Sequence, residues 1–180
     1  MNGYLRGMTL ALGAALMLPA AAQGQACTAP IPAGTCTATT STALTVGLLI
    51  QLTLSSTTTT LAAPALSDYD AGFVANQGPI ATVKSNRAWR LQLSGAAATW
   101  TATNTQPGIA ARTNKPTSDL QWSTAAGGPF AGLTTVPVTA VSGAATGGAA
   151  SNLYYRTLYD WTLDTPGSYS LTVVFTIVSP

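Results

Sequence analysis

Two aspartates separated by one residue form the most concentrated acidic site of the sequence, in the segment Ser-Asp-Tyr-Asp-Ala-Gly at positions 67–72. Alternate carboxylates can turn toward one cation and the glycine permits a tight bend, so Asp68 and Asp70 are candidate calcium ligands. No third carboxylate follows at ligand spacing, and Asp and Gly are ordinary turn residues. The pattern therefore favours a plain turn, with a calcium loop as the alternative.

Catalytic chemistry has few residues to draw on in this chain of 180, which contains no histidine and no glutamate. Without imidazole there is no Ser-His-Asp or Cys-His nucleophile system and no histidine metal ligand. Asp160 and Asp164 could be paired glycosidase carboxylates, but they fall at the end of an expected strand and in its turn, where solvated aspartates are common. The sequence therefore predicts no catalytic residue, no cofactor and a protein that is not an enzyme.

Four tryptophans and six tyrosines are the remaining groups that could bind a ligand. Exposed flat rings stack on sugars in carbohydrate-binding modules, and Tyr154, Trp100 and Trp161 are candidates for such a platform. Core packing is the alternative, which the alternating apolar context of Trp89 and Trp122 favours for those two rings. A secreted carbohydrate-binding module is therefore one of two functions that the sequence supports.

The charge content is low, with 7% charged residues against 47% hydrophobic ones and a formal net charge of +2. The few basic residues are scattered and give no electrostatic footprint for nucleic acid. A nearly neutral surface has little long-range self-repulsion, so copies of the protein associate easily. The expected partners are therefore other copies of the chain or an extracellular surface, and no nucleic acid.

Residues 1–22 have the pattern of a secretory signal peptide, with an apolar run from Met8 to Leu18 followed by small residues. Cleavage after Ala22 or after Ala26 would fit. The apolar run is shorter than the roughly 20 residues of a transmembrane helix, so no stable membrane span is expected in the mature chain. We therefore expect an exported protein, located in the periplasm, at the cell surface or in the extracellular space.

Cys27 and Cys36 are the two cysteines of the chain, and both follow the expected signal. In an oxidising compartment they should form one disulfide, which closes a small loop in the N-terminal segment at residues 23–42. A redox-active pair is disfavoured because the spacing is not Cys-x-x-Cys. Acylation of Cys27 as a lipoprotein is disfavoured by Gly24, at a position where such signals normally have Leu.

The rest of the chain is rich in Thr, Val, Ser, Gly and aromatic residues, a composition of strands and turns. Between Ala43 and Leu54 apolar residues alternate, which predicts one long half-buried strand. Its apolar face consists of Leu44, Val46, Leu48, Ile50, Leu52 and Leu54. Further strands are expected at residues 79–85, 88–94, 98–104, 119–124, 133–141, 152–163 and 169–178, of which the first two could instead be one bent strand. The last two should pair across a Pro-Gly turn, and the Gly-rich residues 143–150 should form a loop.

About seven or eight strands with turn signals between them predict a single antiparallel β-sandwich domain over residues 43–180. The ending Pro-Gly-Ser-Tyr-Ser-Leu-Thr-Val-Val-Phe-Thr at positions 166–176 resembles the last strands of bacterial Ig-like sandwich domains. Residues 83–91, Val-Lys-Ser-Asn-Arg-Ala-Trp-Arg-Leu, are similar to a strand of exported, pilin-like and surface-associated domains. This resemblance implies an all-β, Ig-like fold, although the chain has no inter-sheet cysteine pair and no Asp four residues before Tyr169.

The second function that the sequence supports is a non-enzymatic, exported structural or adhesive protein, such as a self-assembling surface or filament subunit. The strand predicted from Ala43 to Leu54 follows a segment closed by a disulfide. It could complete its own sheet, or it could insert into the open edge of a neighbouring subunit by strand addition. The sequence leaves both arrangements open.

Overall fold

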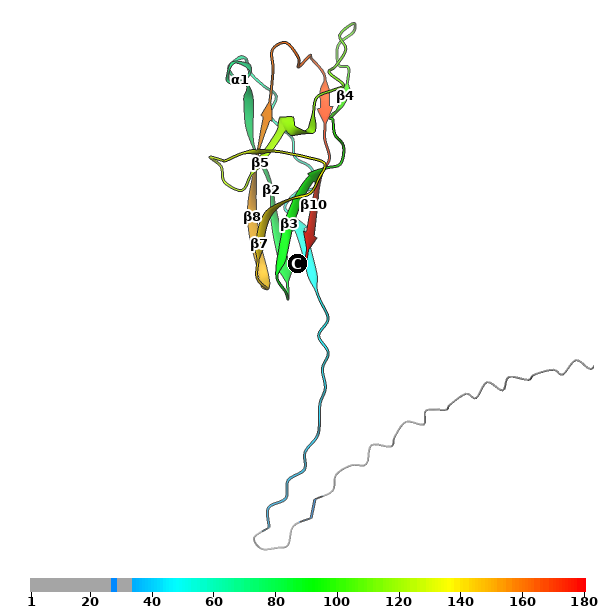
Figure 1. The fold of residues 1–180 in the computed structure, drawn as a ribbon, viewed down its shortest axis with the longest axis vertical. Coiled ribbons are helices and arrows are strands. Elements are labelled where there is room, and N and C mark those ends of the chain that lie inside the picture. The colour runs from blue at the N-terminus through cyan, green and yellow to red at the C-terminus, as the bar shows by residue number, and fades with distance from the viewer. Residues whose placement is uncertain (1–26, 29–33) are drawn as a thin grey trace, which may run out of the picture. The chain divides into compact units, whose positions relative to one another are not determined.

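The computed structural model describes residues 27–28 and 34–180 of the chain, which Figure 1 shows as a ribbon. The chain divides into two units, with the boundary between Thr45 and Val46. In the first unit Cys27 and Cys36 form the predicted disulfide, with their Cα atoms 5.7 Å apart. The expected signal peptide and both of its cleavage positions lie outside the described residues. None of the described helices is long and apolar enough to cross a membrane.

The second unit is built mostly from antiparallel β-strands, which confirms the expectation of an all-β chain. Its helical segments are one short α-helix and one 3-10 turn, α1 (Leu66–Ala71) and η1 (Thr117–Asp119). The strands are β1 (Ile50–Leu54), β2 (Phe73–Ser85), β3 (Trp89–Gly95), β4 (Thr101–Thr103), β5 (Leu120–Ser123), β6 (Ala131–Gly132), β7 (Val138–Gly143), β8 (Thr146–Leu158), β9 (Ser168–Ser170) and β10 (Val173–Val178).

The strands form a five-stranded sheet in the order β1-β2-β8-β5-β6, a three-stranded sheet in the order β10-β3-β7, and the pair β4-β9. The longest ladder joins β2 and β8, which pair from Phe73 opposite Leu158 to Ser85 opposite Thr146. In the three-stranded sheet β3 lies between β10 and β7. The residues predicted at 79–85 and 88–94 are therefore two separate strands in two different sheets.

One hydrophobic core joins side chains from both larger sheets. In β3, Trp89, Leu91 and Leu93 are buried while Arg90 is exposed, the alternation expected of a strand with one face on the core. The five-stranded sheet contributes Ala81, Val83, Leu120, Trp122, Leu153 and Tyr155 to the same core. The core positions predicted for Trp89 and Trp122 are confirmed.

The first strand is shorter than predicted, because pairing begins at Ile50 rather than at Ala43. Ile50 lies opposite Ser85, the last residue of β2, so the residues before Ile50 extend past the end of their partner strand. Apolar alternation determines which side chains share a face, but it does not determine where the neighbouring strand ends. The segment before β1 is therefore extended without a strand partner in the described chain.

The expected C-terminal hairpin is wrong, and so is the loop expected at residues 143–150. The strand β8 pairs with β2 and β5, whereas β10 pairs with β3 in the other sheet. Thr146 already belongs to β8, and its small residues Ala149 and Ala150 lie opposite Val83 and Thr82 of β2. Pairing with a long neighbour overrides the weak strand preference of these residues.

Candidate functional site

The row of apolar side chains on one face of β1 continues into the segment that precedes the strand, where these side chains are exposed to solvent. Leu52 and Leu54 pack against the core, but Val46 and Leu48 are 71% and 55% exposed. Leu49, which points to the opposite side in an extended chain, is also 71% exposed. Large apolar side chains at strand spacing without a covering partner are typical of a surface that another segment covers.

Asn86, which follows β2, holds the backbone of this exposed segment. Its side-chain Oδ1 accepts a hydrogen bond from the Leu49 amide at 3.0 Å, and its Nδ2 donates to the Gly47 carbonyl at 2.8 Å. The Asn86 amide in turn donates to the Leu49 carbonyl at 3.2 Å. The segment therefore leaves the sheet along a fixed path.

The edge of the five-stranded sheet has no paired strand beyond the other end of β1 in the described chain. The strand β1 pairs with β2 from Ala81 to Ser85, and in the described chain no strand pairs with Phe73–Pro79 on that side. The chain leaves β1 at Ser55, whose side chain accepts a hydrogen bond from the Ile80 amide. The segment after β1 contacts this part of β2, because the Ala62 amide donates a hydrogen bond to Asn76 Oδ1 at 2.8 Å. A strand added at this edge would therefore have to displace that segment.

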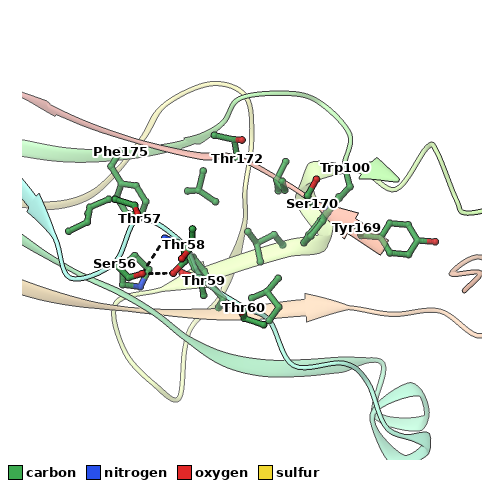
Figure 2. A pocket seen from close by; sticks show the side chains of 17 residues that line it. Ser56, Thr57, Thr58, Thr59, Thr60, Trp100, Tyr169, Ser170, Thr172 and Phe175 are labelled. Atoms are coloured by element: carbon green, nitrogen blue, oxygen red, sulfur yellow. Dashed lines mark hydrogen bonds between the residues drawn. The ribbon is translucent and has the colours of Figure 1, made fainter. Parts of the chain in front are cut away.

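A pocket of about 470 Å³ lies beside this edge and reaches the core. One wall is the threonine-rich segment 56–61, and another is formed by residues 169–173 of β9 and the start of β10. Figure 2 shows these side chains, with Ser170 and Thr172 across the pocket from Thr59 and Thr60. The lining also includes the core residues Trp100, Leu120, Tyr155 and Phe175. The pocket is a groove into which apolar side chains can be inserted.

The three rings predicted as a ligand platform have different environments. Trp100 is buried and donates its indole N–H to the Pro116 carbonyl at 3.1 Å. Tyr154 is half-buried within β8. Trp161 lies in the turn after β8, where 56% of the residue is exposed. Of the three, Trp161 alone combines a large exposed surface with contact to another ring.

The ring that contacts Trp161 is Tyr69 of α1, a residue that was not among the predicted platform residues. The two ring centroids are 4.6 Å apart with an interplanar angle of 30°. Tyr159 lies 5.5 Å from Tyr69 on its other side. Burial raises the pKa of Tyr159 to about 12, with smaller contributions from Tyr69 and nearby aspartates. The sequence carried no direct signal for this cluster, because α1 and the turn after β8 are about ninety residues apart.

The candidate calcium ligands lie in α1 rather than in a plain turn. Asp68 Oδ2 accepts a hydrogen bond from the Ala65 amide at 2.7 Å, while Asp70 Oδ1 accepts one from the Trp161 indole at 3.3 Å. Gly72 ends the helix with φ of +77°, a conformation that glycine adopts without strain. Among the described residues no three His, Cys, Asp or Glu side chains are grouped to hold a metal ion.

Asp164 is buried in a cluster of four charged side chains, contrary to the expectation of a solvated turn residue. Its Oδ1 accepts hydrogen bonds from Lys115 Nζ at 2.9 Å and from Arg112 Nη1 at 3.0 Å. Asp119 completes the cluster, 3.2 Å from Lys115 and 3.5 Å from Arg112. The Asp164 carboxylate is therefore paired with two cations. Asp160, by contrast, is exposed, and hydrogen bonds from Thr162 lower its pKa.

No model of a known protein family matches the chain, and no curated protein is significantly similar to it in sequence.

Proposed function

We propose that the protein is a non-enzymatic, exported structural subunit that assembles with copies of itself through the segment before β1. The observation that carries this proposal is the exposed apolar face of Val46 and Leu48, which continues the half-buried face of β1 and which no described residue covers. The proposal includes an Ig-like sandwich arrangement of the two larger sheets, a pilin-like or adhesive role and a location at the cell surface.

The hydrophobic effect supports insertion of this segment into another copy. Full burial of a Val or Leu side chain contributes about 1.5 to 3 kcal/mol. Leu44, Val46 and Leu48 share one face of an extended chain, so their burial together contributes about 5 kcal/mol or more before the entropy of association is subtracted. Repulsion opposes this contact only weakly, because the chain is almost neutral.

The groove beside the edge of β2 is the proposed receptor for this segment. A strand that displaces the segment after β1 can form backbone hydrogen bonds with the Phe73–Pro79 part of β2, while its alternate side chains enter the pocket near Pro79. The groove already reaches Trp100, Tyr155 and Phe175, so an inserted apolar side chain would join an existing core. Because no strand in the part of the chain that the structure describes pairs with this segment, exchange between copies is favoured over completion of its own sheet.

Two variants of equal exposure test which face of the segment is inserted. Val46→Asp and Leu49→Asp each place a charge at a position that is 71% exposed, but on opposite faces of the extended chain. We expect the mature wild-type protein to form oligomers or filaments in sedimentation and electron microscopy, Val46→Asp to remain monomeric, and Leu49→Asp to assemble. Circular dichroism should show that both variants fold. Wild-type protein that stays monomeric at all concentrations would contradict the proposal.

Cysteine cross-linking between two different variants tests the receptor. A Val46→Cys protein mixed with a Thr59→Cys protein should form an intermolecular disulfide, because Thr59 lines the groove. Leu49→Cys mixed with Thr59→Cys is the matched control, and we expect at least tenfold less cross-linked dimer. Equal yields from the two mixtures would show that the groove does not receive the apolar face.

A further inference from the structure

A second surface lies at the other end of the sheets from the start of β1, where Figure 1 places α1. It consists of Tyr69 and Asp70 of α1 together with Trp161 of the turn after β8, and we call it the apical ring site. The exposed residues Leu66 and Leu163 belong to the same two segments. The proposed assembly through the segment before β1 makes no use of this surface.

The turn that carries Trp161 is held in place by hydrogen bonds. The Asp164 amide donates to the Asp160 carbonyl at 3.0 Å, and the Asp160 amide donates to Asp164 Oδ2 at 2.9 Å. Asp160 Oδ1 also accepts hydrogen bonds from the amides of Thr162 and Leu163. Since Asp164 is fixed by the buried cations, the backbone on both sides of Trp161 is fixed as well.

The indole itself is also held in one orientation. Tyr69 contacts its ring, and Asp70 Oδ1 accepts the hydrogen bond from its N–H. The other three tryptophans, Trp89, Trp100 and Trp122, are buried. An exposed ring that is already immobilised loses little conformational entropy when it binds a ligand.

The charges around the apical ring site select the class of ligand. Asp68, Asp70 and Asp160 lie on the two segments that form the site, whereas the nearby cations Arg112 and Lys115 are paired with Asp119 and Asp164. This distribution repels anions. Carboxylates are strong acceptors for the hydroxyl groups of a neutral ligand, and Asp70 has an oxygen that the indole does not use.

We propose that the apical ring site binds a neutral saccharide, which stacks on Trp161 and donates a hydroxyl hydrogen bond to Asp70. The C–H face of a pyranose ring is apolar and flat, so it buries against an aromatic face, while its equatorial hydroxyls point to the side where carboxylates lie. The groove that is the proposed receptor is lined by other residues than Tyr69, Asp70 and Trp161, so the saccharide site is a function additional to assembly.

Tryptophan fluorescence tests the proposal directly, because Trp161 is the tryptophan with a large exposed surface. Dextran, a soluble mannan and laminarin serve as neutral probes, and polygalacturonate serves as the anionic one. We expect a saturable emission change with at least one neutral probe and none with polygalacturonate. Calorimetry with the same probe should then give at least tenfold weaker binding for Trp161→Ala and a several-fold loss for Asp70→Asn. Val136→Ala, a change at an exposed apolar residue outside the site, should bind as the wild type does.

Three results would overturn the saccharide site. One is the absence of any emission change with all three neutral probes at millimolar sugar concentration. Another is wild-type affinity in a Trp161→Ala protein whose thermal unfolding shows that it is folded. The third is an emission change caused by raising the protein concentration alone and removed by Trp161→Ala, which would make the site an interface between copies. Because the assembly variant Val46→Asp retains the site, its saccharide binding separates failure of this proposal from failure of the assembly proposal.

Discussion

Lys115 donates a hydrogen bond to Asp164 across 2.9 Å, with only 2% and 4% of the two side chains exposed to solvent. The pair joins the loop before β5 to the turn after β8. Lys115 Nζ also donates to the Leu158 carbonyl at 2.8 Å and lies 5.1 Å from the centre of the Tyr159 ring. Four of the few charged residues of the chain therefore form one cluster without net charge next to the apical ring site. They are Arg112, Lys115, Asp119 and Asp164.

Removal of the Asp164 charge should destabilise the fold strongly. Asp164→Asn leaves Arg112 and Lys115 with Asp119 as their remaining carboxylate, and breaking a buried ion pair typically costs about 3 to 5 kcal/mol. Urea unfolding followed by circular dichroism measures this loss. Asp160→Asn, four residues earlier and exposed to solvent, is the matched control and should have a much smaller effect. Equal losses in the two variants would contradict a structural role for the cluster.

The hydroxyl of Tyr169 should contribute measurably to stability. It donates to the Thr165 carbonyl at 2.6 Å and accepts from the Arg112 amide at 3.0 Å, a contact of the kind found in tyrosine corners. Figure 2 shows its ring pointing away from the groove. We expect Tyr169→Phe to lower the free energy of unfolding by about 1 to 3 kcal/mol. Tyr154→Phe should change it by much less, and a reversed order would refute this assignment.

Stability should fall at alkaline pH because of buried tyrosines. Burial raises the pKa of Tyr155 to about 12, from an ordinary value of 10.0, and the pKa of Tyr159 is raised to a similar value. Between these pH values the unfolded chain has lost the protons that the folded chain still binds, so the free energy of unfolding decreases as pH rises. Urea titrations should give a constant value between about pH 7 and pH 9 and a fall above about pH 10. Tyr155→Phe should reduce that fall by about 2 kcal/mol, and an unchanged pH profile would contradict this cause.

Replacement of Arg156 by lysine should lower the stability of the fold. Its guanidinium lies 4.1 Å from the centre of the Phe73 ring and 4.4 Å from that of Phe130, so it is positioned between two aromatic faces. A planar guanidinium stacks on rings where an ammonium does not. We expect Arg156→Lys to destabilise the fold by about 1 kcal/mol in thermal unfolding. Arg90→Lys, at an exposed position of β3, should leave the midpoint unchanged.

The sequence pattern predicts burial correctly in strands where apolar and polar residues alternate. The core positions of Trp89, Leu91 and Leu93 follow from β3 alone, and the disulfide follows from the compartment expected of the chain. Pairing partners were not predictable in the same way. The residues of β8 and β10 are close in sequence and suggested a hairpin, yet each pairs with a strand from the first half of the chain.

The contacts within the apical ring site were likewise not predictable from the sequence. An exposed Trp161 fits the sequence expectation of a ring available to ligands, but its partner Tyr69 was visible only as part of a candidate calcium loop. Asp164 was expected in water because turns are usually solvated, and nothing in the spacing relates it to Arg112 or Lys115. Such clusters are produced by topology, which local spacing does not encode.

Asn86 has a mechanical consequence for the proposed assembly. In a filament joined through the segment before β1, each connection would begin at the residues that Asn86 holds, Gly47 and Leu49. The bending stiffness of the whole fibre would then depend on one side-chain amide per subunit. Loss of that amide would make the segment before β1 flexible at its base. The persistence length of the fibre would then be shorter, although the contact between its subunits would be equally strong.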